Sequence, residues 1–320
     1  MKALLSKAAG GPESLALGDL PSPQAGPGQV VVAVRACGVN FPDVLMIQDK
    51  YQFKPPRPFA PGGEIAGVVE SVGAGVTDWK AGDRIMGTIG HGGLAEKIAV
   101  DPTRMFRLPE ERSFAEGAAL ILTYGTTIHA LLDRGHLKAG QTLLVLGAAG
   151  GVGLAAVELG KAFGARVVAA VSSEEKAQAC REAGADEVLI YGRAPFDKEQ
   201  SKALADQFKA VGGDYAEPAL RSIGWEARYL VVGFPAGIPR LPLNLTLLKS
   251  CDVCGVFWGA FAARDPQANA AHIQHLFRLW AEGRIAPRVT EVFPFDRGGD
   301  AIAKMAGRGA IGKLVVDVAA

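Results

Sequence analysis

The sequence has no long run of apolar residues, because glycine or a charged residue interrupts every candidate before the ~18 residues that a membrane span needs. The first residues also lack a signal-peptide core, since Lys2 and Lys7 leave too short an apolar stretch between them. These two absences favour a soluble, cytoplasmic protein with no membrane partner.

An excess of charge of one sign is missing as well. The chain has 34 Lys and Arg residues against 33 Asp and Glu residues, a formal net charge of +1, so no one-sign field exists to steer a polyanion. Nucleic acid is therefore not an expected partner. Four cysteines in 320 residues do not form the dense framework of small secreted domains, and reduced thiols are expected.

Glycine is abundant, with 41 residues and no Gly-X-Y repeat, which implies many tight turns. Residues 1–122 contain short apolar runs, such as QVVVAVRA and EIAGVVESVG, separated by glycine-rich turns, and this pattern indicates a small β-barrel. From about residue 123, helical stretches alternate with short aliphatic runs, which is typical of βαβ units around a parallel sheet. The predicted fold class is α/β.

The most informative stretch is residues 142–176, which the pattern predicts to be a strand, a glycine-rich turn, a helix and a second strand. Glycines recur every three residues in the turn, a variant of the dinucleotide-binding fingerprint. Pyrophosphate is attracted to free N–H groups at the start of a helix, and a Cβ on the turn would block its approach. The predicted cofactor-binding residues of this turn are Gly147, Gly150, Gly151, Val152 and Gly153.

The residues after the second strand indicate which dinucleotide binds. An NAD enzyme carries an acidic residue there for the ribose 2′-hydroxyl, whereas this chain has Ser172 and Ser173, followed by Lys176. Two hydroxyls and a cation suit a 2′-phosphate, which a carboxylate would repel, so the expected cofactor is NADPH. An alternative interpretation is a capping box, with Ser172 as N-cap and Glu175 three residues on.

The runs A-C-G-V-N-F-P-D (36–43) and P-G-G-E-I-A-G (61–67) precede this coenzyme domain and resemble the medium-chain dehydrogenase/reductase superfamily. In the zinc alcohol dehydrogenases of that superfamily, a Cys in the first run and a His in the second bind the catalytic zinc. Here Asn40 and Gly63 stand at those two positions, and neither is a plausible zinc ligand. The four-cysteine lobe of structural zinc is also absent, so no metal is expected.

Five motifs in order resemble the zinc-independent NADPH:quinone oxidoreductase family of that superfamily: G-V-N-F-P-D, GHGGLAE, TYGTT, GAAGGVG and GKLVVDV. The resemblance covers nearly the whole chain. It implies a GroES-like β-barrel catalytic domain at residues 1–122, completed by residues 259–320. It also implies a Rossmann NADP-binding domain with a doubly wound parallel sheet at residues 123–258, and an electrophilic acceptor such as a quinone.

The resemblance also implies roles for single residues. Asn40, Tyr51 and Thr127 correspond to contacts of the nicotinamide and ribose, and Ser173, Lys176 and Tyr191 to contacts of the adenosine phosphate. Phe234, Phe257 and Trp258 correspond to segments that wall the nicotinamide, and Arg308 and Lys313 to cofactor contacts near the C-terminus.

Asn40 and Tyr51 are the predicted catalytic residues. An amide N–H or a phenol O–H is a neutral donor to a developing quinol oxyanion, and Tyr51 could also supply a proton as a general acid. Without the resemblance, Asn40 would be interpreted as a turn residue and Tyr51 as a partly buried aromatic.

Two other functions share these cofactor motifs. One is a reductase of activated C=C bonds, such as enones or enoyl-CoA groups, and the other is a protein that binds NADPH without turnover. A homodimer is a further expectation, because the last strand of the Rossmann sheet, in DVCGVFW (252–258), would be an exposed apolar edge that a second copy could cover.

One stretch departs from the family pattern. The resemblance implies a fourth Rossmann strand where this sequence has only Val211, Gly212, Gly213 and Asp214. That strand lies between the first and fifth in the usual order, so its loss would split the sheet and leave two rows of unpaired backbone groups. We therefore expect about a dozen residues, counted by the resemblance, to be absent from this sequence rather than from the molecule.

Overall fold

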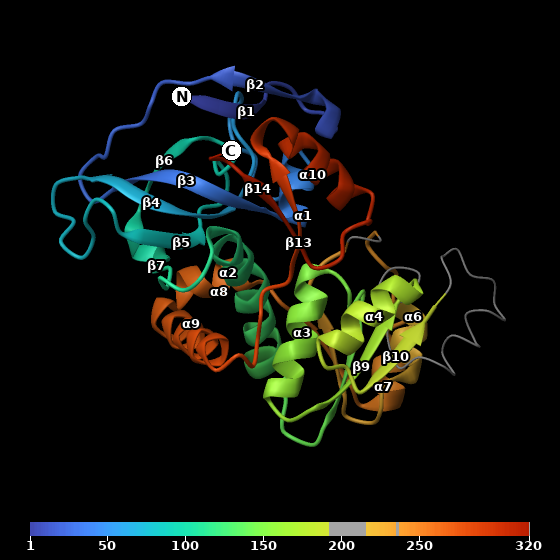
Figure 1. Cartoon of the computed structure of the whole chain (residues 1–320). Coiled ribbons are helices and arrows are strands. Elements are labelled where there is room, and N and C mark those ends of the chain that lie inside the picture. Colours follow the sequence, from blue (N-terminus) through green and yellow to red (C-terminus); the bar gives the residue numbers. More distant parts are fainter. Residues whose placement is uncertain (192–215, 235–236, 320) are drawn as a thin grey trace. The chain divides into compact units, whose positions relative to one another are not determined.

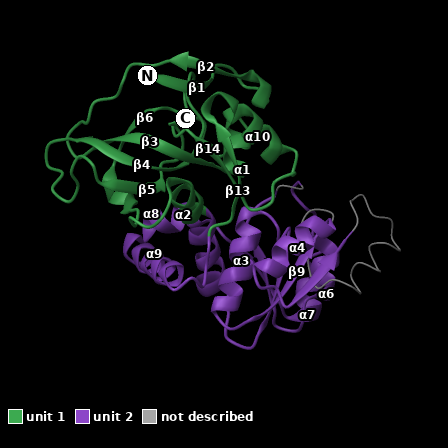
Figure 2. Ribbon diagram, in the orientation of Figure 1, with its two compact units in different colours: residues 1–122, 287–320 green, residues 123–286 purple. Residues whose placement is uncertain are grey.

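The computed structural model describes residues 1–191, 216–234 and 237–319. The chain divides into two compact units (Figure 2). Unit 1 comprises residues 1–122 and 287–320, and unit 2 comprises residues 123–286. The expected fourth Rossmann strand, at residues 211–214, lies outside the described residues.

Unit 1 is built mainly of β-structure. Its strands are β1 (Lys2–Ser6), β2 (Leu15–Asp19), β3 (Val30–Val39), β4 (Glu64–Val72), β5 (Arg84–Thr88), β6 (Lys97–Val100), β7 (Met105–Arg107), β13 (Val289–Pro294) and β14 (Lys313–Asp317). Its helices are α1 (Phe41–Ile47) and α10 (Gly298–Ala306), with 3-10 turns at Pro12–Ser14, Pro102–Arg104 and Phe295–Arg297. Helix α2 (Phe114–Ile128) carries the chain from unit 1 into unit 2.

Seven strands of unit 1 form one sheet in the order β13-β14-β3-β4-β5-β7, with β6 also paired to β3, and β1 and β2 form a separate pair. The path of the described strands has two ends, β13 and β7, so the predicted β-rich unit is present without full closure of the barrel. Strand β3 is central and nearly all buried because its residues, VVVAVRACGV, are almost continuously apolar.

The register of this sheet brings distant parts of the sequence together. Antiparallel pairing sets Leu314 of β14 opposite Val39 of β3, and Gly38 of β3 opposite Glu64 of β4. The end of β3 therefore lies between the starts of β14 and β4. Helix α1 begins directly after this point, at Phe41.

Unit 2 alternates strands and helices, as predicted. Its strands are β8 (Thr142–Leu146), β9 (Arg166–Val171), β10 (Glu187–Ile190), β11 (Arg228–Val231) and β12 (Asp252–Gly255). Its helical segments, besides the second half of α2, are a π-helical segment (His129–Arg134), α3 (Gly151–Ala162), α4 (Glu174–Glu182), α6 (Ala216–Ser222), α7 (Asn244–Lys249), α8 (Trp258–Arg264) and α9 (Pro266–Ala281).

All strand pairs of unit 2 are parallel, and among the described residues they form two sheets, β10-β9-β8 and β11-β12. Helices α3 and α4 both pack against β9, whose RVVAAV sequence is buried from its second residue on (Figure 1). The order β10-β9-β8 is the 3-2-1 half of a doubly wound fold.

The chain returns to unit 1 later than the sequence predicted. Residues 259–320 were expected to complete the first domain, but the return lies at Pro287. The physical reason is packing: α8 and α9 belong to unit 2, where the ring of Phe261 stacks on His129 with ring centres 4.1 Å apart.

Strand β12 pairs only with β11 among the described strands, and its Val253 side chain is 40 % exposed. The pairing of two copies through this edge stays a prediction. Within the described ranges, no helix combines the length and the apolar character that crossing a membrane requires.

Candidate functional site

The first cluster of predicted site residues lies in unit 1, at the end of β3. Asn40 is 5 % exposed, and its Nδ2 donates to the carbonyl of Gly38 and to Oε2 of Glu64, each at 3.1 Å. Its Oδ1 accepts a hydrogen bond of 2.6 Å from Nζ of Lys313. Both amide protons and the carbonyl oxygen of Asn40 are therefore engaged inside unit 1, so the predicted role of a free donor does not fit this geometry.

Lys313 occupies a different environment from the one that the sequence predicted. It was expected to contact the cofactor, yet its side chain is 3 % exposed, and Nζ donates to Glu64 at 2.8 Å and to Asn40 at 2.6 Å. Its third proton faces the carbonyl of Val39 at 3.5 Å. An ammonium has only three protons, so none remains for a cofactor phosphate. This reassigns Lys313 to the buried core of unit 1.

Sequence reasoning missed Glu64, which is 0 % exposed. Its Oε2 accepts from Asn40 and Lys313, and its Oε1 accepts from the backbone N–H of Leu122 at 2.9 Å. A glutamate that begins an otherwise apolar strand, EIAGVV, is the signal that could have revealed it, because a fully buried carboxylate needs partners of this kind.

Asp43 is a second missed carboxyl, 1 % exposed on the first turn of α1. Its two oxygens accept from the backbone N–H groups of Asn40, at 2.8 Å, and Gly62, at 3.0 Å. Burial raises the pKa of Asp43 to about 6, although these hydrogen bonds and the charge of Lys313 oppose the rise. Its position three residues after Asn40 is the N-terminal signal of a short helix.

Two glycines near this cluster allow a neighbouring backbone to approach closely because they lack a side chain. A Cβ on Gly38 would lie 1.9 Å from the carbonyl oxygen of Ala118, so only glycine fits there. A Cβ on Gly63 would lie 2.8 Å from the carbonyl oxygen of Gly90. The position at which the zinc alcohol dehydrogenases carry a histidine ligand is therefore too tight here for a side chain. Within the described ranges, no group of three His, Cys, Asp or Glu side chains is arranged to hold a metal.

Tyr51 follows α1 and packs against the hydrophobic core of unit 1. Burial, and to a smaller extent the charge of Asp43, raise the pKa of its phenol above the usual value. The phenol therefore keeps its proton at neutral pH. In the part of the chain that the structure describes, no acceptor takes this proton, so Tyr51 has the donor capacity that Asn40 lacks.

Arg308, the other predicted contact near the C-terminus, lies in the turn between α10 and β14 and is exposed. Its φ of +57° is in the left-handed region.

The second set of predicted residues lies in unit 2, around the turn between β8 and α3. Gly147 has a φ of +56°, which favours glycine, and a Cβ on Gly153 would lie 2.4 Å from the carbonyl oxygen of Gly147. Gly150 is the N-cap of α3 and has no side chain to bond the first amides. The turn is thus held close to the helix by backbone packing.

The start of α3 offers its first N–H groups to a ligand. Gly151, Val152 and Gly153 are the first three residues of this twelve-residue helix, and amides at these positions have no intrahelical acceptor. A Cβ on Gly150 would meet only the oxygen of Gly147, at 3.5 Å, so the approach is open. Free amides and the positive end of the helix dipole together fit a pyrophosphate.

The ends of three parallel strands meet at this edge of the sheet. Gly147 follows β8, Ser172 follows β9, and Tyr191 follows β10 and donates its backbone N–H to the carbonyl of Val171 at 2.9 Å. In an open parallel sheet, ligands bind at the carboxyl ends of the strands. The structure therefore brings these three predicted cofactor residues to one edge.

Ser172, Ser173 and Lys176 also come together there. Ser173 is the N-cap of α4 and accepts from the backbone N–H of Lys176, whereas Nζ of Lys176 lies 3.4 Å from Oγ of Ser172. The alternative capping box assigned the cap to Ser172, and the structure assigns it to Ser173. Ser172 thus keeps its own proton for another acceptor, beside a cation.

The remaining predicted residues of unit 2 fall into two kinds. Thr127 and Trp258 are buried: the hydroxyl of Thr127 donates to Thr123, and the indole of Trp258 donates to Asn269 at 2.9 Å. Phe257 is 60 % exposed and Phe234 47 % exposed.

Thr127 also lies beside the start of α3, because its hydroxyl is 3.4 Å from the carbonyl of Val152. The ring of Trp258 packs against Gly125 of α2, so Trp258 is part of the core of unit 2. Phe234 and Phe257 follow β11 and β12, which run parallel, and so lie at the same end of that pair.

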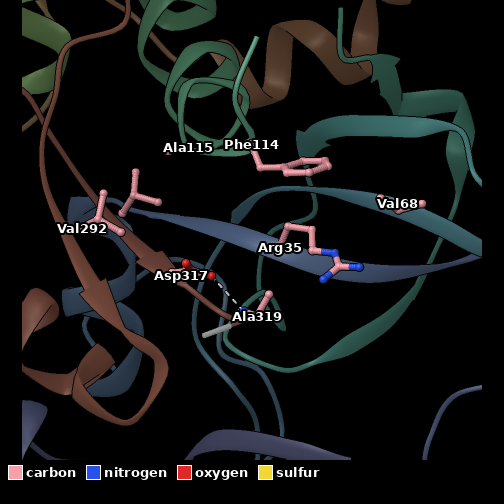
Figure 3. A pocket seen from close by; sticks show the side chains of 8 residues that line it. Arg35, Val68, Phe114, Ala115, Val292, Asp317 and Ala319 are labelled. Atoms are coloured by element: carbon pink, nitrogen blue, oxygen red, sulfur yellow. Dashed lines mark hydrogen bonds between the residues drawn. The ribbon is translucent and has the colours of Figure 1, made fainter. Parts of the chain in front are cut away.

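A hollow of about 360 Å³ lies elsewhere in unit 1, and Arg35, Val68, Phe114, Val292 and Asp317 are among the residues that line it (Figure 3). None of the predicted site residues lines it. Its carboxylate, Asp317, accepts the backbone N–H of Ala319 at 2.9 Å. The hollow is thus separate from both clusters.

The combination of a GroES-like sheet unit and a Rossmann-like unit defines the medium-chain dehydrogenase/reductase fold. Residues 26–110 match the family model of the alcohol dehydrogenase GroES-like domain, and residues 151–274 match the model named zinc-binding dehydrogenase.

Individual relatives indicate which family of this superfamily the chain resembles. The quinone oxidoreductase-like protein 2 homolog of Nematostella vectensis is 38 % identical over 302 residues, which cover 91 % of this chain and 82 % of that protein. A probable oxidoreductase from Mycobacterium abscessus has a TM-score of 0.83 and 37 % identity, with 99 % of both chains covered. Escherichia coli quinone oxidoreductase, solved with NADPH, has a TM-score of 0.87 and 26 % identity, with 99 % of this chain and 100 % of that chain covered.

The chain belongs to the zinc-independent quinone oxidoreductase family of this superfamily. Membership makes it an oxidoreductase of a family that binds NADP(H).

The raised pKa of Asp43 predicts that the free energy of unfolding depends on pH. A carboxyl with a pKa of about 6 when folded and about 4 when unfolded binds its proton more tightly in the folded chain. The free energy of unfolding should therefore fall as pH rises from about 4 to about 6, by up to about 3 kcal/mol from this group, and then level off. Urea denaturation of the wild type and of Asp43→Asn at several pH values measures the effect, with the exposed Asp296→Asn as control. Equal slopes in wild type and Asp43→Asn would contradict it.

The position of Lys176 beside Ser172 predicts a preference for NADPH over NADH. If its ammonium binds the 2′-phosphate, Lys176→Met removes a charge-assisted hydrogen bond of about 1.5–3 kcal/mol and weakens NADPH binding about 10- to 100-fold. NADH lacks that phosphate, so its Kd should not change. Fluorescence titration with both cofactors measures the two Kd values. Lys138→Met, at the opposite end of β8, is the matched control, and an equal loss for NADH and NADPH would refute the assignment.

Proposed function

We propose that this chain is an NADPH-dependent reductase that transfers hydride to a quinone or a similar electrophilic acceptor without a metal. The observation that carries the proposal is the pair of Ser172 and Lys176 at the end of β9, beside the open start of α3. A cation and a hydroxyl there suit a 2′-phosphate, where an NAD enzyme has an acidic residue. The names of the relatives support the quinone as acceptor.

When bound, the cofactor supplies the hydride. The chain binds and orients the cofactor and protonates the reduced acceptor. In this proposal the amides of Gly151, Val152 and Gly153 hold the pyrophosphate, and Lys176 and Ser172 hold the 2′-phosphate. Tyr191 lies at the same edge of the sheet.

Tyr51 is the acid in the proposed reaction. Reduction of a quinone by a hydride leaves one oxygen with a negative charge, which a neutral donor stabilises and a proton then neutralises. The phenol of Tyr51 keeps its proton at neutral pH because its pKa is raised. Asn40, whose protons are engaged with Gly38 and Glu64, holds the start of α1 rather than the acceptor oxygen.

The rival function is reduction of an activated C=C bond, which needs the same cofactor site and a proton donor. An NADPH-binding protein without turnover is the other alternative. The exposed phenylalanines Phe234 and Phe257 would suit a flat, apolar acceptor in either reductase, so they do not separate the two.

The acceptor is tested by following NADPH oxidation, with NADH in parallel, against ortho- and para-quinones, an enone and a short enoyl-CoA. The proposal expects turnover with the quinones and a clear preference for NADPH. Turnover only with the enone or the enoyl-CoA would move the assignment to double-bond reduction. Tight NADPH binding without turnover on any of these acceptors would favour the binding protein.

Removal of the Tyr51 hydroxyl tests the proton donor. General acid catalysis contributes about 10²- to 10⁴-fold, so Tyr51→Phe should lower kcat by about 100-fold or more with little change in the Kd of NADPH. Steady-state kinetics with the best acceptor measures kcat and KM. Tyr229→Phe, which removes a hydroxyl from β11, is the matched control and should retain activity. Full activity of Tyr51→Phe would exclude this role.

A further inference from the structure

Lys313, Glu64 and Asn40 form a buried, hydrogen-bonded polar group in unit 1. Three strands contribute to it: Lys313 begins β14, Glu64 begins β4, and Asn40 directly follows β3. The residues are far apart in the sequence, since Lys313 follows Glu64 by 249 positions. Pairing of the strands in the sheet is what brings them together.

Three oxygens converge on the ammonium of Lys313: Oε2 of Glu64, Oδ1 of Asn40 and the carbonyl of Val39. Lys313 and Glu64 are 3 % and 0 % exposed, so neither can exchange its partner for water. A buried ion that loses its partner is strongly destabilising, which ties both side chains to this arrangement.

The amide of Asn40 is held at both ends by these charges. Lys313 donates to its oxygen, and Glu64 accepts from its nitrogen, so a flip of the amide would place N–H groups against an ammonium and an oxygen against a carboxylate. The ion pair therefore permits only one orientation of Asn40.

Hydrogen bonds at both ends of α1 connect Asn40 with the segment that leads to Tyr51. The backbone N–H of Asn40 donates to Asp43 on the first turn of α1, and at the other end of α1 the N–H of Lys50 donates to Leu45. Tyr51 is the next residue. The segment from Asn40 to Lys50 is thus one hydrogen-bonded unit. Lys313 and Glu64 hold its first residue, and Tyr51, the proposed acid, directly follows its last.

We propose that Lys313 and Glu64 are positioning residues for the reduction, and that their ion pair clamps Asn40 so that the segment carrying Tyr51 stays in place. This inference rests on the proposed function for its catalytic part. It differs from the expectation that Lys313 contacts the cofactor, because the clamp uses all three protons of the ammonium. Binding of NADPH should therefore not depend on Lys313.

The test compares Lys313→Met, Glu64→Gln and the double variant. Each single variant leaves one buried charge without its partner and should lower the Tm, whereas the double variant removes both charges at nearly constant volume and should recover most of the Tm. The clamp is lost in all three. We expect the double variant to keep a kcat at least 10-fold below wild type, with a Kd for NADPH within twofold.

Two results of these kinetics would overturn the proposal. A double variant that recovers kcat together with the Tm would show that the pair serves stability alone. A Kd for NADPH that rises tenfold or more in Lys313→Met and in the stable double variant would return Lys313 to the cofactor site.

A second readout does not depend on turnover. The chain has three asparagines, Asn40, Asn244 and Asn269, so selective ¹⁵N labelling gives three side-chain amide pairs in an NMR spectrum. The amide protons of Asn40 should exchange with solvent slowly in the wild type and at least 10-fold faster in the double variant. Asn244, which is exposed, and Asn269, which accepts from Trp258, should exchange at the same rates in both.

The two readouts separate the two proposals. If the wild type turns over none of the acceptors, the proposed function fails, and the exchange of the Asn40 amide alone decides the clamp. If the Asn40 protons exchange at the same rate in the wild type and in the double variant, the clamp is refuted whatever the kinetics show.

Discussion

The buried ion pair between Lys313 and Glu64 is the interaction on which the organisation of unit 1 depends. Two charges that are almost completely withdrawn from water tolerate only an arrangement in which each keeps its partners. The pairing of β14 with β3 meets that requirement, because it places Lys313 beside Asn40 and Glu64. The sheet register, the start of α1 and the orientation of one amide thus all meet at a single electrostatic constraint.

Unit 2 meets a similar demand for charge stabilisation by different means. It offers backbone amides at the start of α3, and it needs glycine there because a Cβ on Gly153 would collide with the carbonyl of Gly147. In unit 1, side chains buried in a sheet balance one another. In unit 2, a helix terminus and an exposed edge of three strands are left open to a ligand. The closed network has the features of a scaffold, and the open edge those of a binding site.

The sequence predicted the architecture and the strand, glycine-rich turn, helix and strand of residues 142–171 better than the individual contacts. The glycine turn, the second strand and the serines after it could be predicted because their signals are local: each depends on residues only a few positions apart. The roles predicted for Lys313 and Asn40 did not fit the structure for the opposite reason. Whether an ammonium or an amide has a proton to spare depends on partners that lie far away in the sequence, here Glu64. The return of the chain at Pro287 also depends on packing, that of α8 and α9 within unit 2.

By itself the sequence determined the α/β class, the division near residue 122, the position of the dinucleotide turn and the absence of zinc ligands at Asn40 and Gly63. These features follow from periodicity, glycine spacing and residue type, which are properties of short segments. Only the tertiary structure decided that Glu64 and Asp43 are buried and that Lys313 forms an ion pair. It also decided that Tyr51 rather than Asn40 has a proton to donate. Hydrogen bonds and burial join residues across the sheet, and their pairing is set by strand register, which no local pattern specifies.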